Sequence, residues 1–528
     1  MKSSSSVFAP IVFAGILVTL GGFLAIRANH AATEFLPALN TEDPGVGQGA
    51  PWIGEAPPRL SRRVVLVVID GLRLRSSFGY RFLDDMRRRG VDAAASSHYP
   101  TISGPSYVSI LTGVPPRWSG IRNNWFNFGV ELDSIMDRAN AAGMPSAYAA
   151  DIASSGGRMF SQDFDDIHVS PWDGGLERSI RLALSRDYPL LVIIPGAVDE
   201  AGHDHGADSS EYIAGISDVD QMLARALGDF DLERDTLIVA ADHGHTDEGG
   251  HGGLEPDVVE VPLIMAGAGI EPGAALADSQ LVDIAPTVAA LLGLPPPGHG
   301  FGRVLTDALT YDDATRERIA ASDKQRIANS ERRADELSAV GETSRSKTRT
   351  GRLAIFAVLV VACAFGFWLV YRLGAVKIDW RILVVAVPAF PIAYYALLDL
   401  FFQHYSLSAV SNKDDTVERL FRFGLVSTAV QVITAWIALG GRAVVRNRLA
   451  AANGLIACGM FVAIVPALWM WSWVAAGPFV EPPSSAESVL VPATYMAVAS
   501  YAVAAAVTLG LEIVVFFARA VDPRIPFD

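Results

Sequence analysis

The residue types best suited to chemistry are concentrated between positions 236 and 253, in the stretch TLIVAADHGHTDEGGHGG. The stretch opens with a short apolar run and then places Asp242, His243, His245 and His251 within ten residues. Carboxylate and imidazole groups are preferred zinc ligands, and the interspersed glycines let the backbone fold tightly around an ion. The pattern therefore favours a metal site over its alternative, a solvated histidine-rich loop.

Three apolar runs that read as buried strands each end close to a carboxylate. The runs span residues 64–69, 190–194 and 237–241. They are followed by Asp70, Asp199 and Asp242, and helix-length segments separate them. This alternation predicts an α/β domain with a mostly parallel sheet flanked by helices. Because ligands of open parallel sheets bind beyond the carboxyl ends of the strands, the three carboxylates predict one shared site.

The composition indicates that part of the chain lies in a membrane. The 528 residues are 51% hydrophobic with a mean hydropathy of +0.30, which is too apolar for a purely soluble protein. The formal net charge of −15 argues against nucleic acid as a partner. Both cysteines, Cys363 and Cys458, lie inside long apolar stretches, so any metal must be held by histidines and carboxylates.

Six apolar runs are long enough to cross a bilayer. The first, residues 7–26, is expected to be an uncleaved anchor, with a cleaved signal peptide as the alternative. The other five are residues 353–371, 382–402, 424–441, 449–475 and 489–517. The expected division is an N-terminal anchor at 1–30, a linker at 31–60, the α/β domain at 61–310, a charged stalk at 311–352 and a five-helix transmembrane region at 353–528.

The charges beside these runs predict an orientation. With the N-terminus inside, the α/β domain lies on the extracytoplasmic side, and Arg372, Lys377 and Arg381 fall inside, as the positive-inside rule requires. Four cations then fall outside: Arg345, Lys347, Arg349 and Arg352. A long exported domain is translocated largely regardless of its charge, so these cations do not reverse the prediction.

Four pieces of the chain, taken together, resemble a known superfamily. They are Asp70 ending VVLVVIDG, Ser103 in YPTISGPSYVSILTG, Asp199 and His203 in DEAGH, and the histidine-rich stretch that begins at Asp242. Over roughly residues 62–309 their order is similar to that of the alkaline phosphatase superfamily. The nearest branches are the type I phosphodiesterase/nucleotide pyrophosphatases and the ethanolamine phosphate transferases of glycolipid-anchor synthesis. The resemblance implies an alkaline-phosphatase-like sheet.

The resemblance also implies a site with two divalent metal ions, of which zinc is the expected kind. One metal would be held by Asp199, His203 and His251, and the other by Asp70, Asp242 and His243, with Ser103 bound to the second. Ser103 would be the nucleophile, and a phosphoserine would pass its group to water or to another alcohol. The competitor of His251 is His299, which is expected in a surface turn.

Two neighbours of the site have alternative interpretations. Asn124 lies at the same ungapped distance after the nucleophile as the phosphate-binding asparagine of the phosphodiesterase branch, but it also suits an ordinary turn. His245 is expected to support a ligand or to lie at the surface rather than to bind metal. Serine at position 103, where the phosphodiesterases usually carry threonine, affects the expected substrate preference rather than the activity.

These features predict a membrane-bound, metal-dependent phosphodiesterase or phosphotransferase acting on a phosphate ester, for which several spans would suit a lipid-linked substrate. The oligomeric state is not predicted. One alternative is a phosphomonoesterase, for which Arg122 is the nearby cation that could bind the extra charge. Another is a transporter or assembly protein with a non-catalytic outer domain, suggested by Asp399 and Glu512 within apolar runs.

Overall fold

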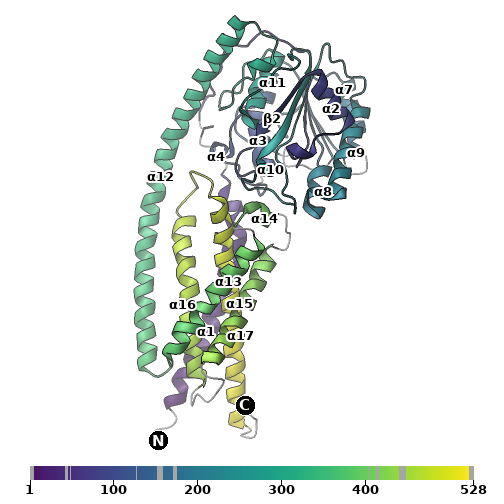
Figure 1. The fold of residues 1–528 in the computed structure, drawn as a ribbon. Helices are drawn as coiled ribbons and strands as arrows, with labels where there is room; N and C mark the ends of the chain where they lie inside the picture. The colour runs from purple at the N-terminus through teal and green to yellow at the C-terminus, as the bar shows by residue number, and fades with distance from the viewer. Residues whose placement is uncertain are drawn as a thin grey trace.

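The computed structural model describes residues 5–41, 46–47, 49–126, 128–151, 159–170, 175–402, 405–411, 416–438 and 448–521. An α/β domain lies at one end of the molecule, and a bundle of long helices extends away from it (Figure 1). Both described ends of the chain lie at the far end of the bundle.

The domain is built on an eight-stranded sheet of order β4-β3-β5-β1-β6-β7-β2-β8. The strands are β1 (Val64–Val68), β2 (Val91–Ser96), β3 (Ser146–Ala150), β4 (Asp166–Val169), β5 (Leu190–Ile194), β6 (Thr236–Ala240), β7 (Glu260–Gly267) and β8 (Ser279–Gln280). The first five strands in spatial order are parallel, whereas β7 runs antiparallel to both β6 and β2. This mostly parallel sheet confirms the predicted α/β fold.

The three strands expected from the sequence lie side by side at the centre of this sheet. Strand β1 pairs with β5 on one side and with β6 on the other, and every residue of the three strands is buried. Strands covered on both faces need continuous β-branched and aliphatic runs, which is what the sequence supplies. Because the three strands are parallel neighbours, their carboxyl ends meet at one edge of the sheet.

Helices cover the sheet and form its connections (Figure 1). They are α2 (Arg81–Arg89), α3 (Ser103–Thr112), α4 (Pro116–Ser119), α5 (Ile135–Ala141), α7 (Gly175–Ser185), α8 (Ala197–His205), α9 (Ser210–Ala226), α10 (Pro256–Val259) and α11 (Ile284–Leu292). Helix α3 is buried along its whole length and ends at Gly113, whose φ of +75° is a left-handed conformation that suits glycine. The buried α3 fixes its first residue, Ser103, against the sheet edge.

The bundle consists of α1 (Ser5–Phe35), α12 (Asp313–Arg372), α13 (Val387–Phe401), α14 (Leu407–Ser411), α15 (Thr416–Ala438), α16 (Arg448–Val474) and α17 (Ser485–Val521), with a π-helical turn at Ile382–Ala386 before α13. Among the described residues, six helices are long and apolar enough to cross a membrane. The chain is therefore a membrane protein. The N-terminal helix α1 packs along α17, the last helix.

Helix α12 differs from the expected stalk followed by a separate span. Its 60 residues form one continuous helix, about 90 Å long at 1.5 Å per residue, which leaves the α/β domain and passes beside the bundle to its far end (Figure 1). The charged part and the apolar part lie in the same helix, and neither contains a proline that would interrupt it.

Loops of the bundle contact the α/β domain directly. The hydroxyl of Tyr99 donates to the carbonyl of Pro483 at 2.8 Å, and the backbone N–H of Gly253 donates to the hydroxyl of Ser408 at 2.9 Å. The carboxylate of Glu255 accepts hydrogen bonds from both Ser406 and Ser408. The bundle therefore holds the loop that follows His251.

Candidate metal centre

The edge of the sheet where β1, β5 and β6 end gathers the predicted ligands. Asp70 follows β1 after one residue, and Asp242 and His243 follow β6. Helix α8 begins just after β5 and presents Asp199 and His203 one turn apart, on the same face. The predicted shared site is therefore the place where these side chains meet.

One group of converging ligand atoms consists of Asp70, Asp242 and His243. The Nε2 atom of His243 lies 3.5 Å from Oδ1 of Asp70 and 3.3 Å from Oδ2 of Asp242. The other ring nitrogen, Nδ1, lies 3.1 Å from the carbonyl of Gly244, so it carries the proton and leaves Nε2 as the free acceptor. Oδ1 of Asp242 accepts from the N–H groups of Gly71 and His243.

The second predicted set, Asp199, His203 and His251, is also brought together. Nε2 of His203 lies 3.6 Å from Oδ2 of Asp199 and 3.1 Å from Nε2 of His251. Nε2 of His251 lies 3.8 Å from Oδ1 of Asp199, and its Nδ1 lies 2.9 Å from the carbonyl of Thr101. The rings of His243 and His251 stack with centroids 3.8 Å apart, so the two sets form one continuous cluster.

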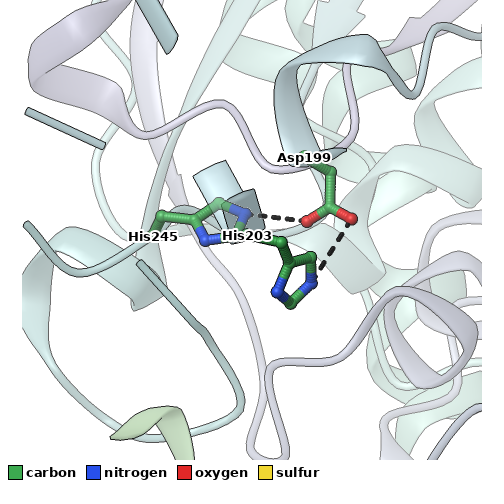
Figure 2. A group of neighbouring side chains, drawn as sticks. All are labelled: Asp199, His203 and His245. Carbon is green, nitrogen blue, oxygen red and sulfur yellow. Dashed lines mark hydrogen bonds and ion pairs between the residues drawn. The ribbon is translucent and has the colours of Figure 1, made fainter. Parts of the chain in front are cut away.

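His245 supports Asp199 in this structure. Figure 2 shows its ring beside Asp199, and its Nε2 lies 2.7 Å from Oδ1 of that carboxylate. Burial lowers the pKa of His245 to about 4, so the ring is neutral at pH 7. Because Nδ1 accepts from the N–H of Gly250 at 3.1 Å, the proton sits on Nε2 and is donated to Asp199. His245 is close enough to join a group with Asp199 and His203, but its tautomer favours the supporting role.

The electrostatics of the cluster fit a bound cation. Burial raises the pKa of Asp70 well above its usual range, and the neighbouring charge of Asp242 raises it further. Burial likewise raises the pKa of Asp242, whose Oδ2 is buried without a hydrogen-bond partner in the described chain. A positive charge between two buried carboxylates that face each other would stabilise their ionised forms. The imidazole nitrogens beside them complete a donor set typical of a divalent metal.

Ser103 faces the centre from the first residue of α3. Its Oγ lies 3.2 Å from Nε2 of His243 and 3.4 Å from Oδ1 of Asp70, and the side chain is largely buried. One turn later on the same helix face, the hydroxyl of Tyr107 donates to Oδ2 of Asp70. Sequence reasoning missed Tyr107, although its spacing of four residues from Ser103 places both on one side of a helix.

Asn124 lies beside Ser103, the expected nucleophile. Its Oδ1 accepts from the N–H of Gly104 at 2.8 Å, while the side chain remains solvent-exposed. A Cβ at Gly104 would lie 2.8 Å from this oxygen, so the close approach requires glycine. The amide of Asn124 can therefore reach a group bound at Ser103.

Two other candidates from the sequence lie away from the centre. Arg122 is buried, and its guanidinium donates to the carbonyls of Phe479 and Val480 in the bundle, at 2.8 and 3.1 Å. Burial, together with the nearby charge of Arg345, lowers its pKa to about 10. His299 is buried rather than in a surface turn, and its two ring nitrogens contact the N–H of Asp133 and the carbonyl of Gly49. His251, not His299, belongs to the cluster.

Comparisons with protein-family models identify the class of protein. A model described as type I phosphodiesterase / nucleotide pyrophosphatase matches residues 64–140, and one described as the metalloenzyme superfamily matches residues 173–296. Together these segments contain β1, Ser103, α8, β6 and the histidine-rich stretch. The resemblance to the phosphodiesterase branch of the alkaline phosphatase superfamily is thus confirmed, and the chain is related to metal-dependent phosphoester enzymes.

Particular relatives extend this result to the transferase branch. The chain is 28% identical to human GPI ethanolamine phosphate transferase 2, catalytic subunit, over 58% of this chain and 34% of that protein. It is 27% identical to mouse GPI ethanolamine phosphate transferase 3, catalytic subunit, over 56% of this chain and 30% of that protein. The chain therefore spans about a third of the length of these curated relatives.

Solved structures that match part of the chain share little sequence with it. Murine ectonucleotide pyrophosphatase/phosphodiesterase 5 is 16% identical, with a TM-score of 0.38, over 45% of this chain and 97% of that one. The lipoteichoic acid synthase LtaP from Listeria monocytogenes is 12% identical, with a TM-score of 0.38, over 55% of this chain and 96% of that one.

Proposed function

We propose that this chain is a membrane-bound, metal-dependent enzyme that uses Ser103 to hydrolyse a phosphodiester or to transfer its phosphoryl-bearing group. The observation that carries the proposal is the clustering of six ligand-type side chains, two of which, Asp70 and His243, lie beside the hydroxyl of a serine at a helix N-terminus. Homology to ethanolamine phosphate transferases supports transfer of such a group.

Two divalent metals, with zinc as the first candidate, are proposed for the centre. Asp70, Asp242 and His243 would hold one metal, and Asp199, His203 and His251 the other, with Ser103 beside the first. Such ions supply positive charge that acidifies a neighbouring hydroxyl and stabilises the oxygens of a phosphoryl group. The unpartnered Oδ2 of Asp242 and the two imidazoles fixed through Nδ1 support this assignment.

The chain's own residues then have the following parts in the reaction. The hydroxyl of Ser103 loses its proton to water as Oγ attacks phosphorus and an O–P bond forms. The bond to the ester oxygen breaks, and this oxygen takes a proton from water and leaves as an alcohol. The N-terminal end of α3 faces the phosphoryl group with its positive dipole, and the amide of Asn124 donates to a phosphoryl oxygen. Water or an acceptor alcohol next attacks phosphorus, and the oxygen of Ser103 regains its proton as it leaves.

We also propose a lipid-linked substrate and an extracytoplasmic catalytic domain. The loop after His251 contacts the bundle, since a Cβ at Gly252 would lie 3.1 Å from the side chain of Leu407 on α14. A substrate held in the membrane would thus reach the centre without leaving the surface of the bilayer. The cations Arg372, Lys377 and Arg381 follow the end of α12 that lies away from the domain, which supports an inside location for that end.

The test is turnover by the full chain, purified in detergent and loaded with zinc. Hydrolysis of a nitrophenyl phosphodiester is compared with that of the matching monoester, with Ser103→Ala as the control. Faster diester turnover that the variant lacks is the expected result. The monoesterase alternative predicts the opposite preference, although Arg122 is engaged by the bundle and does not face the centre. Turnover that persists in Ser103→Ala would contradict the proposed nucleophile.

A further inference from the structure

Three arginines mark the place where α12 changes from polar to apolar sequence. Arg345, Arg349 and Arg352 have the spacing of one helix face, and Arg352 is followed by the uncharged residues 353–371. These cations therefore lie at the level where α12 enters the bilayer, on the side of the α/β domain. In the proposed orientation the positive-inside rule does not explain them, because the inside cations begin at Arg372.

The same face of α12 meets a series of tryptophans on α16. The guanidinium carbon of Arg349 lies 5.7 Å from the ring centroid of Trp469, and that of Arg352 lies 4.8 Å from the ring centroid of Trp471. Tryptophan concentrates at the boundary between water and hydrocarbon, where its amphipathic ring is stable. The pairs therefore place two cations at the depth of lipid headgroups.

A cavity of about 430 Å³ opens beside these residues, at the junction of α12 with the loop between α16 and α17. Arg345 and Arg349 line it together with Trp473 and Phe479, and none of its lining residues belongs to the metal centre. Arg345 is fixed in place because its guanidinium donates to the carbonyls of Trp473 and Pro478, each at 3.0 Å. The cavity is thus a preformed space with a basic wall.

Arg349 in the basic wall, and Arg352 one turn further along α12, lack an anionic partner within the described chain. Nε of Arg349 and Nη1 of Arg352 are buried without a hydrogen-bond partner there. Of the three glutamates that line the cavity, Glu481 pairs with Arg117 and Glu487 accepts from the backbone at the start of α17, while the third is solvent-exposed. Buried guanidinium nitrogens without partners are costly, so the wall is suited to an anion.

We propose that Arg349 and Arg352, with Trp469 and Trp471, bind the phosphate group of an anionic phospholipid, whose headgroup occupies the cavity beside Arg345. The planar guanidinium groups suit bidentate contact with phosphate oxygens. The indole rings lie where the glycerol and upper acyl carbons of the lipid would pack. The site shares no residue with the metal centre, so a lipid bound here would not be held by the proposed catalytic groups.

The test measures lipid binding by the full chain in neutral detergent. Fluorescent phosphatidylglycerol is titrated onto the protein, and unlabelled phosphatidylglycerol, phosphatidylcholine and inorganic phosphate compete for it. We expect phosphatidylglycerol to compete at least about tenfold better than phosphatidylcholine, and millimolar phosphate not to compete. The double variant Arg349→Gln/Arg352→Gln should bind about 10- to 30-fold more weakly, since each cation near an anionic surface contributes about 1 kcal/mol.

Two control variants distinguish a specific lipid-binding site from non-specific electrostatic attraction of an anionic lipid to the helix. Lys347→Gln removes one charge from an exposed position of the same helix and should weaken binding no more than about fivefold. The double variant Arg349→Lys/Arg352→Lys keeps the charge but loses the planar groups, and we expect it to lose most of the preference for phosphatidylglycerol.

Three results would overturn the proposal. The double lysine variant could bind fluorescent phosphatidylglycerol as the wild type does, or the two unlabelled lipids could compete equally well. Displacement of the fluorescent lipid by inorganic phosphate would instead assign the basic wall to a free phosphate ion. Turnover of the soluble nitrophenyl phosphodiester serves as the folding control and should be unchanged in every variant. It is independent of the lipid result, so failure of this proposal and failure of the proposed function are distinguishable.

Discussion

Tyr107→Phe tests whether the buried side chains around the centre are arranged for metal binding. The hydroxyl of Tyr107 donates to Oδ2 of Asp70, and the ring is buried in the core of the domain. Phenylalanine keeps the ring and its packing but removes this donor. Asp70 then loses the contact that orients its carboxylate toward Asp242 and His243.

The size of the effect follows from the kind of hydrogen bond that is lost. A hydrogen bond to a charged group contributes about 1.5–3 kcal/mol, and loss of a residue that orients a metal ligand typically lowers metal affinity by about 10- to 100-fold. We therefore expect a decrease of this size for the metal bound by Asp70. The metal bound by Asp199 should be much less affected, because Tyr107 contacts none of its predicted ligands.

The assay is metal content after equilibration of the full chain with a series of zinc-buffered solutions. The wild type should hold two metals at a free zinc concentration where Tyr107→Phe holds one. Tyr311→Phe is the matched control, because that buried hydroxyl lies 2.9 and 2.8 Å from the carbonyls of Pro58 and Ala290, which share its proton away from the centre. It should bind metal as the wild type does.

Equal zinc affinity in Tyr107→Phe and the wild type would refute the role of Tyr107. An equal loss in Tyr311→Phe would show that the effect comes from general destabilisation of the domain rather than from orientation of Asp70.

Two further predictions concern the surroundings of the centre. Ser408→Ala removes the acceptor of the Gly253 N–H, so amide hydrogen exchange in residues 252–255 should become about 2- to 10-fold faster, for a hydrogen bond of about 0.5–1.5 kcal/mol. Burial raises the pKa of Asp151 to about 6 from its usual 3.8, so the folded chain binds this proton more tightly than the unfolded chain. The stability that the protonated Asp151 carboxyl contributes is therefore lost as pH rises from about 4 to about 6. Asp151→Asn should stabilise the metal-free protein at pH 7 by at most about 3 kcal/mol. In thermal melts, the difference between this variant and the wild type should vanish near pH 4.

Each of these predictions has a contradicting outcome. Exchange in the loop that is unchanged in Ser408→Ala, or equally fast in the control Ser472→Ala within α16, would mean that the bundle does not hold the loop. If the melting temperature of Asp151→Asn stays at or below the wild-type value across the whole pH range, the ionised carboxylate of Asp151 does not destabilise the folded protein. Asparagine retains an oxygen that can accept from the N–H of Gly196, so that contact is not the cause of any difference.

The central part of the fold could be predicted because local sequence determines it. The β-branched and aliphatic runs of β1, β5 and β6 favour buried strands, and the carboxylates that follow these parallel neighbours share one sheet edge for that reason. The antiparallel strands β2 and β7 were not predicted. Residues of β2 such as Asp92 and Ala93 are not fully buried and carry no clear period, so the pairing with β7 depends on tertiary structure.

The parts of the site that sequence reasoning missed depend on contacts between distant segments. Arg122 seemed close to Ser103 in the chain, but its guanidinium binds carbonyls of a bundle loop more than 350 residues away. The burial of His299 depends likewise on Gly49 of the linker. For His245 the sequence left a supporting role and a surface position open, and the contact with the Gly250 N–H, which fixes the tautomer, favours the supporting role. The spacing of residues along the sequence does not predict such contacts between distant segments.

The central claim, that Ser103 is a covalent nucleophile at a metal centre, is tested most directly by trapping the intermediate. Zinc-loaded full chain is mixed with the nitrophenyl ester of phosphoethanolamine, quenched in acid, digested and examined by mass spectrometry. The account predicts a phosphoethanolamine group on Ser103, absent from Ser103→Ala and retained in Ser106→Ala, a matched change one turn along α3. Nitrophenol release at the wild-type rate by Ser103→Ala, or an adduct on another residue, would contradict it.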